Sequence, residues 1–210
     1  MISVSILKEK DNYEQAIDKI NNTDCDFIHL DIMDNTFTNN VSFSKEDSKT
    51  IVDKSKKKID VHLMSYDLNN LIDYYISLKP SIISFHYEAT NNINEYIEKI
   101  KENNIKVGLA INPNTSIDKI KEYLPFIDVV LVLSVLPGKS GQKFIDSTKD
   151  KIKELYKIRN KYNYLIEVDG GINKDTIDLV NNYTDIVVSG SFITDANNYQ
   201  SQIDLLKKSV

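Results

Sequence analysis

Histidine and aspartate alternate with apolar residues in two short segments of this chain. The first, "FIHLDIM" (27–33), places His29, Asp31 and Met33 at every second position. Because successive side chains of a strand point to opposite faces, these three side chains share one face. A carboxylate directed into a protein interior costs several kcal/mol unless it is paired or coordinated. This face is therefore predicted to meet a charge, a metal ion or water.

The second segment, "IDVHLM" (59–64), repeats the pattern with Asp60, His62 and Met64 on one face. A later apolar run ends in "EVDGG" and adds Asp169 at its last position. Imidazole nitrogens together with carboxylate oxygens suit Zn²⁺, Fe²⁺, Mn²⁺ or Co²⁺, whereas Mg²⁺ prefers fewer histidines. The joint placement predicts a site for one divalent metal ion. For each residue taken alone, a hydrogen-bonded structural role stays open.

The third histidine, His86, also lies at the end of an apolar run. It follows Ser84 on its face, and we assign it no acidic partner. We therefore expect His86 to have a structural role or to lie beside a bound substrate, rather than to be a metal ligand.

Eight short runs rich in β-forming residues recur along the 210 residues. They span residues 2–7, 27–32, 59–64, 81–86, 105–111, 127–133, 164–169 and 185–190. Apolar residues at helical spacing occur in the segments 12–21, 68–77, 93–102, 116–124, 148–162 and 174–182. Units of about 26 residues favour a single (β/α)₈ TIM barrel over a doubly wound sheet. All three histidines then lie near the carboxyl ends of strands, which form the active face of such a barrel.

The composition argues against two classes of binding partner, nucleic acids and membranes. The formal net charge of −5, with lysines scattered among acidic residues, argues against nucleic acid. No apolar run approaches the roughly 20 residues of a membrane helix. The first residues pass from a short apolar stretch directly into charges, unlike a secretory signal peptide, and the single cysteine, Cys25, fits a reducing compartment. We therefore expect a cytoplasmic protein with no membrane partner.

No linker, low-complexity tract or break in composition divides the chain, which predicts one domain over residues 1–210. The sequence leaves the oligomeric state open, and a homo-oligomer is one alternative. Tyr74 and Tyr75 are candidates for a subunit interface, although the packing of their own helix explains them equally well.

Glycine-bearing turns follow the last three predicted strands: "PGKSGQKF" (137–144), "DGGIN" (169–173) and "SGSF" (189–192). Backbone N–H groups in such turns can bind a phosphate group without a lysine. The loops after the seventh and eighth strands are the usual phosphate site of this barrel. The first turn is also long enough to form a lid. These turns predict a phosphorylated small-molecule ligand.

Taken together, these segments resemble the ribulose-phosphate 3-epimerase family over nearly the whole chain. The resemblance rests on "VSIL", "HLDIMD", "DVHLMS", "ISFHYEA", "VGLAINPNT", "LPGKSGQKFI", "EVDGGIN" and "SGS", in the family's order and approximate spacing. It implies a metal-dependent isomerase of the pentose phosphate pathway. Such an enzyme interconverts D-ribulose 5-phosphate and D-xylulose 5-phosphate at C3 through a cis-enediolate that the metal stabilises.

The resemblance also implies roles for individual residues. One divalent metal ion would be bound by His29, Asp31, His62 and Asp169. Asp31 and Asp169 would act as the catalytic acid and base. Substrate contacts would come from Ser5, His62, Met33, Met64, Gly138, Lys139, Ser140, Gly141, Gly170, Gly171, Gly190 and Ser191. For the two methionines, filling of the core is an equally good interpretation.

The chain departs from the family pattern in two loops and one strand. It reads "MDNTFTNN" where the family has "MDGxFVPN", so that Asn35, Thr38 and Asn39 replace glycine, valine and proline. Leu133 replaces a methionine, and the lid reads "PGKSGQ" in place of "PGFGGQ", with Ser140 at a glycine position. None of these changes removes an implied ligand. They bear on loop closure and substrate preference.

Other functions fit the same barrel. An allulose-6-phosphate 3-epimerase would use the same metal and the same aspartates, and a non-catalytic barrel could bind a sugar phosphate. A metal-independent decarboxylase would need Asp-x-Lys-x-x-Asp on the third strand, where this chain has His62 and Ser65 at the second and third of those positions. A Schiff-base aldolase would need a lysine at a strand end, and none of the eight predicted ends carries one. We set the last two aside.

Overall fold

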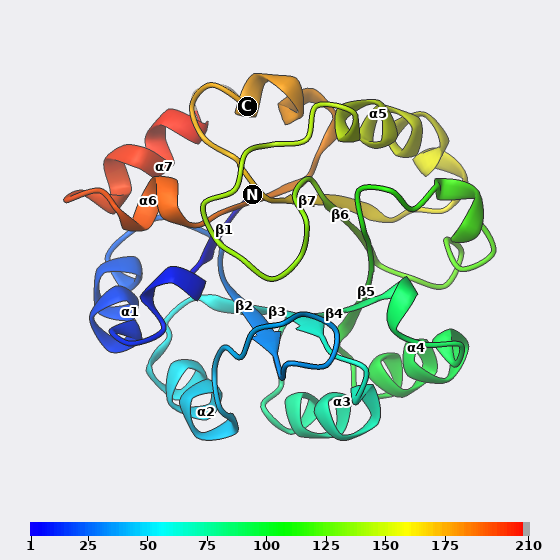
Figure 1. The fold of residues 1–210 in the computed structure, drawn as a ribbon, viewed down its shortest axis with the longest axis horizontal. Coiled ribbons are helices and arrows are strands. Elements are labelled where there is room, and N and C mark those ends of the chain that lie inside the picture. Colours follow the sequence, from blue (N-terminus) through cyan, green and yellow to red (C-terminus); the bar gives the residue numbers. More distant parts are fainter. Residues whose placement is uncertain (208–210) are drawn as a thin grey trace.

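The computed structural model describes residues 1–207, which form a closed barrel of eight parallel strands surrounded by helices (Figure 1). The strands are β1 (Ile2–Ser5), β2 (Phe27–Met33), β3 (Lys58–Met64), β4 (Ile82–His86), β5 (Lys106–Ile111), β6 (Val129–Leu133), β7 (Leu165–Asp169) and β8 (Ile186–Ser189). Each strand pairs with the next, and β8 pairs with β1. The predicted TIM barrel is confirmed. The predicted domain over 1–210 also includes residues 208–210, which lie outside the described part of the chain.

Seven α-helices lie around the barrel in the described residues (Figure 1). They are α1 (Tyr13–Asn21), α2 (Lys45–Lys54), α3 (Leu68–Ser77), α4 (Ile93–Glu102), α5 (Thr148–Ile158), α6 (Ser191–Thr194) and α7 (Tyr199–Lys207). Short 3₁₀ turns span Leu7–Glu9, Tyr87–Ala89, Ile117–Lys119, Arg159–Lys161, Ile177–Leu179 and Asn181–Tyr183. The helical spacing of apolar residues thus predicted α1, α3, α4 and α5.

Two predicted helices, at 116–124 and 174–182, are wrong, because these segments form only 3₁₀ turns. Both segments contain a pair of buried residues three positions apart, Ile117 and Ile120 in the first and Ile177 and Val180 in the second. A 3₁₀ turn places such a pair on one side as well as an α-helix does. The first segment is followed by Pro125, which disfavours helical backbone at the residue before it. The second is rich in threonine, aspartate and asparagine, which are weak helix formers.

The interior of the barrel is apolar at the amino ends of the strands and polar towards their carboxyl ends. Phe27, Ile82, Val129 and Ile186 form an apolar cluster contributed by the four even-numbered strands. This is the layered packing expected inside an eight-stranded barrel. Above it the inward positions carry polar side chains, including the buried Asp60, His62 and Glu167. Apolar side chains therefore fill the amino end of the barrel, and the polar side chains that could take part in a reaction lie towards its carboxyl end.

Gly108 in β5 faces Ser84 of β4, and its missing side chain makes room for that serine. A Cβ atom at Gly108 would lie 2.0 Å from Ser84 Oγ and 2.9 Å from Ser84 Cβ. We expect Gly108→Ala to lower the free energy of unfolding by about 1–3 kcal/mol, as overpacked cores do. Denaturant unfolding measures this, and adding Ser84→Gly in the same chain should restore most of the loss. Unchanged stability of the single variant would contradict the close packing.

Tyr75 on α3 is buried, and its hydroxyl lies 2.8 Å from Ser48 Oγ on α2. Tyr74 is partly buried and packs against the same core. Helix packing therefore accounts for Tyr75, and for the part of Tyr74 that contacts the core. Cys25 is buried and free, and none of the helices in residues 1–207 is long and apolar enough to cross a membrane.

Candidate active site at the carboxyl ends of the strands

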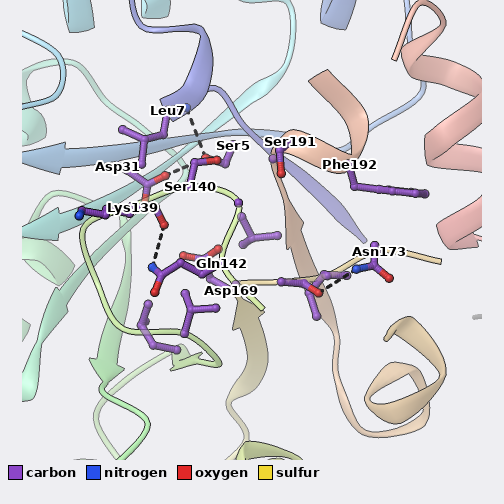
Figure 2. A pocket seen from close by; sticks show the side chains of 18 of the residues that line it. Ser5, Leu7, Asp31, Lys139, Ser140, Gln142, Asp169, Asn173, Ser191 and Phe192 are labelled. Carbon is purple, nitrogen blue, oxygen red and sulfur yellow. Dashed lines mark hydrogen bonds between the residues drawn. The ribbon is translucent and has the colours of Figure 1, made fainter. Parts of the chain in front are cut away.

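A cavity of about 580 Å³ opens at the carboxyl ends of the strands (Figure 2). Most of the residues predicted to contact substrate line it, together with two of the predicted metal ligands. These are Ser5, Asp31, Met64, Gly138, Lys139, Ser140, Gly141, Asp169, Gly170, Gly171, Gly190 and Ser191. Three further predicted residues, His29, His62 and Met33, are buried outside this lining. The loop between β6 and α5 forms much of one wall of the cavity. This loop contains the predicted lid.

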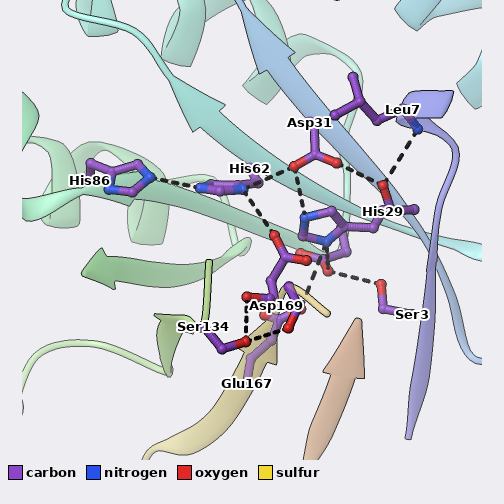
Figure 3. A network of polar contacts seen from close by, with 12 residues as sticks. Ser3, Leu7, His29, Asp31, His62, His86, Ser134, Glu167 and Asp169 are labelled. Atoms are coloured by element: carbon purple, nitrogen blue, oxygen red, sulfur yellow. Dashed lines mark hydrogen bonds and ion pairs between the residues drawn. The ribbon is translucent and has the colours of Figure 1, made fainter. Parts of the chain in front are cut away.

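The four predicted metal ligands meet at the base of this cavity (Figure 3). One nitrogen or oxygen atom from each of His29, Asp31, His62 and Asp169 lies within 4.8 Å of the corresponding atom of every other. His62 Nδ1 is 3.2 Å from Asp31 Oδ1 and 4.0 Å from Asp169 Oδ2. Ligand atoms about 2.1 Å from a shared ion lie at most about 4.2 Å apart. The donor atoms therefore have nearly the spacing that a small divalent cation needs.

The contacts of His29 give a test of whether a metal ion fits the cluster. Its Nδ1 lies 2.6 Å from Asp60 Oδ2, to which it donates a hydrogen bond. Its Nε2 is buried without a hydrogen-bond partner and lies 3.5 Å from Asp31 Oδ1. A buried nitrogen left without a partner costs about 1–3 kcal/mol. A cation at this place would satisfy Nε2, and the residues present therefore fit a divalent metal ion.

The pKa values of Asp31 and Asp169 are shifted in opposite directions. Burial raises the pKa of Asp31, but the imidazoles of His29 and His62 outweigh burial and hold that pKa below its ordinary value. Burial, assisted by the charge of Asp31, raises the pKa of Asp169 to about 7. Asp31 Oδ2 also accepts a hydrogen bond of 2.7 Å from the Ser5 hydroxyl (Figure 2). Two carboxyl groups whose environments separate their pKa values can serve as an acid and a base at the same pH.

A further pair of buried carboxyl groups lies directly beneath the cluster. Asp60 accepts hydrogen bonds from Ser3 Oγ, at 3.0 Å, and from His29. Glu167 lies 3.8 Å from His29 Nδ1 (Figure 3), and burial together with the charge of Asp60 raises its pKa well above the ordinary value. Glu167 was not among the residues predicted for the site, although strand alternation places it on the same face as Asp169. The short contact with Asp60 holds the His29 ring in one orientation.

Comparison with known proteins shows the family of this chain. Residues 1–194 match the model of the ribulose-phosphate 3 epimerase family. The chain belongs to this family. A ribulose-phosphate 3-epimerase from Buchnera aphidicola subsp. Baizongia pistaciae is 43% identical over 192 residues, covering 87% of this chain and 84% of that protein. One from Helicobacter pylori strain J99 is 33% identical over 196 residues, covering 92% and 89%.

Solved structures of other barrels share the fold with lower identity. The 3-hexulose-6-phosphate synthase of Salmonella typhimurium has a TM-score of 0.72 at 17% identity and covers 99% of this chain and 97% of that chain. A structure of KGPDC from Streptococcus mutans has a TM-score of 0.71 at 14% identity, with 99% and 95% covered. At these identities the likeness shows a common barrel architecture and nothing about the reaction.

The backbone accommodates the departures from the family pattern. Asn35, at a family glycine position, has a φ of +67°, a left-handed conformation that asparagine tolerates better than most residues. In the lid, positive φ occurs at Gly138 and Gly141, not at Ser140. Asn40 Nδ2 donates to the Gly138 carbonyl at 3.0 Å, which joins the altered loop after β2 to the lid. The backbone conformations at Asn35 and Ser140 are therefore compatible with the residues found there, and one hydrogen bond connects the two loops.

Proposed function

We propose that this chain is a metal-dependent ribulose-phosphate 3-epimerase that interconverts D-ribulose 5-phosphate and D-xylulose 5-phosphate. The observation that carries the proposal is the position of Asp31 and Asp169, two carboxyl groups of opposite pKa shift within one buried cluster that also fits a metal ion. Family membership supports the same reaction, since the matched relatives bear this name.

Inversion at C3 needs a base on one face of the carbon and an acid on the other. Asp31 extends from β2 and Asp169 from β7, and β8 and β1 separate these strands around the barrel. The two carboxyl groups thus approach the cavity from different directions. One removes the C3 proton and the other returns a proton to the opposite face, and their roles exchange when the reaction reverses. The Ser5 hydroxyl, which donates to Asp31, keeps that carboxylate oriented towards the reacting carbon.

His29, Asp31, His62 and Asp169 would hold the metal ion. Bound there, one ion of Zn²⁺, Fe²⁺, Mn²⁺ or Co²⁺ would supply a Lewis acid for the ketone oxygen and the adjacent hydroxyl. The loops at Gly138–Gly141, Gly170–Gly171 and Gly190–Ser191 line the same cavity and offer backbone N–H groups to the phosphate. Lys139 in the lid is exposed and adds a positive charge near the mouth.

The six-carbon alternative, allulose 6-phosphate, requires the same groups and differs only in the length of the sugar. We expect the five-carbon ketose phosphate to be preferred, because the matched relatives are ribulose-phosphate 3-epimerases. Parallel measurement of kcat/KM with D-ribulose 5-phosphate and allulose 6-phosphate tests this. A higher kcat/KM with the six-carbon substrate would reassign the enzyme, and no turnover of either would favour a non-catalytic sugar-phosphate barrel.

Metal binding should strengthen as the pH rises from 5.5 to 7. The pKa of Asp169 is raised to about 7 by burial and by Asp31, and despite burial the charges of Asp60 and Asp31 hold the pKa of His29 well above its ordinary value. Below pH 7 protons on these groups compete with the cation, so zinc affinity should rise by about tenfold per pH unit for each proton displaced. Competition with a chelator measures this. Affinity that does not change over this range would contradict the proposed ligand set.

A further inference from the structure

A chain of hydrogen bonds leads away from the proposed metal site through His62. His62 Nε2 lies 2.9 Å from His86 Nε2 (Figure 3), and His86 Nδ1 lies 3.0 Å from Glu88 Oε2. The other carboxylate oxygen, Glu88 Oε1, accepts a hydrogen bond of 2.9 Å from the Asn112 backbone N–H and another from the Thr115 hydroxyl. The chain thus begins at a proposed metal ligand and ends on the loop after β5.

In this series of hydrogen bonds, each imidazole nitrogen can be assigned as a donor or as an acceptor. Burial raises the pKa of Glu88, but hydrogen bonds from His86, Thr115 and Asn112 outweigh it and lower the pKa to about 2. A carboxylate only accepts hydrogen bonds, so His86 Nδ1 must carry the proton that it donates. The His86 ring is fully buried, and a neutral ring protonated at Nδ1 has an unprotonated Nε2 that accepts a hydrogen bond. The proton between the two rings therefore belongs to His62 Nε2.

We propose that His86 and Glu88 are positioning residues that fix the tautomer of His62. In the metal-loaded protein, a proton on Nε2 leaves the lone pair of His62 Nδ1 for the ion. Nδ1 lies 3.2 Å from Asp31 Oδ1, a spacing that two ligand atoms of one cation can have. The other tautomer would place a hydrogen where the cation must bind. The inference rests on the proposed metal site, because it assigns the nitrogen by which His62 would bind the ion.

The surroundings of His86 hold this arrangement in place. His62 and His86 are fully buried, so water cannot replace either partner. The Phe37 ring packs on His86 with ring centroids 4.5 Å apart and planes inclined by 35°. His29 is oriented in a comparable way, although its Nδ1 meets the carboxylate of Asp60 directly. Both imidazoles thus have their second nitrogen fixed by protein groups, which is how metal-ligating histidines are commonly oriented.

The tautomers can be observed directly, because the chain contains only three histidines. A two-bond ¹H–¹⁵N correlation spectrum of the uniformly labelled, zinc-loaded protein resolves three imidazole patterns. We expect His86 to be protonated at Nδ1 and bare at Nε2, and His62 to be protonated at Nε2. A spectrum with His86 protonated at Nε2 would overturn the inference.

The isosteric substitution Glu88→Gln tests the same series of hydrogen bonds from Glu88 through His86 to His62. The Asn112 N–H and the Thr115 hydroxyl donate to the amide oxygen, so the amide NH₂ faces His86 Nδ1. That nitrogen must then be unprotonated, so that it can accept a hydrogen bond from the amide. Both rings should then reverse their tautomers, and zinc affinity, measured by competition with a chelator, should fall by about 10- to 100-fold. Thr115→Val, which leaves the carboxylate in place, is the matched control and should keep the wild-type ring pattern.

A second pair of variants covers the case in which Glu88→Gln does not fold. His86→Gln offers a carbonyl oxygen to His62 Nε2–H, whereas His86→Leu offers no acceptor, so zinc should bind at least about tenfold more tightly to the glutamine variant. Equal affinity of these two variants, or wild-type affinity in Glu88→Gln, would overturn the inference while leaving the proposed function intact. A wild-type protein that binds no zinc would instead contradict the proposed metal site, and the inference with it.

Discussion

Asp31→Asn and Asp169→Asn are each expected to lower kcat/KM for D-ribulose 5-phosphate by about 10²–10⁴-fold, the range supplied by a positioned acid or base. Asparagine keeps the shape and one oxygen of the side chain but cannot accept or deliver the C3 proton. A coupled assay for D-xylulose 5-phosphate measures the loss. Because both aspartates are also proposed metal ligands, the variants should be assayed at saturating metal, with metal content determined in parallel.

Asp128→Asn is a suitable control for these two variants. Asp128 lies at the amino end of β6, at the opposite end of the barrel from the cavity, where its carboxylate accepts the Val107 backbone N–H at 3.0 Å. An amide oxygen can accept the same hydrogen bond, so activity should match that of the wild type. Activity that persists in Asp31→Asn or Asp169→Asn at the level of this control would remove that aspartate from the mechanism.

Removal of the metal should have the second large effect. A Lewis acid contributes several kcal/mol of transition-state stabilisation, which corresponds to about a 10³-fold loss of kcat/KM after exhaustive chelation. Zn²⁺, Fe²⁺, Mn²⁺ or Co²⁺ should restore activity, and Mg²⁺ should restore less, because two of the four proposed ligands are imidazoles.

Binding of the metal should also raise the thermal midpoint of unfolding, since an ion that binds only the folded chain stabilises it. This readout does not depend on turnover, and it separates a bound metal from one that acts on the substrate in solution. Full activity in protein shown to be metal-free would contradict the account of the cluster.

The fold could be predicted from sequence because the eight strands carry a local signal. Runs such as "FIHLDIM" and "IDVVLVL" are short, apolar and rich in β-branched residues, and all eight such runs form strands. The helical segments could be predicted only in part, because a spacing of three residues fits 3₁₀ turns and α-helices alike. At 116–124 and 174–182 the connections to the next strand therefore contain 3₁₀ turns where the pattern predicted α-helices.

The proposed metal cluster could be predicted because its side chains alternate within single strands and all lie near the same strand ends. The partners that orient these side chains could not, because they depend on register between strands and on turns beyond strand ends. Glu88 belongs to the 3₁₀ turn Tyr87–Ala89 and follows His86 by two residues. The prediction that His86 has no acidic partner is therefore wrong. The contact of His86 with His62 requires the pairing of β3 with β4, which no local pattern specifies.

The most direct test of the whole account is exchange of the C3 proton with solvent deuterium. Metal-replete enzyme would be incubated with D-ribulose 5-phosphate in D₂O and the sugar phosphates followed by ¹H NMR. The account predicts deuterium at C3 together with formation of D-xylulose 5-phosphate, and loss of epimer formation in Asp31→Asn and Asp169→Asn. Epimer formation without deuterium at C3, or undiminished epimerisation in either variant, would contradict proton transfer by these two aspartates.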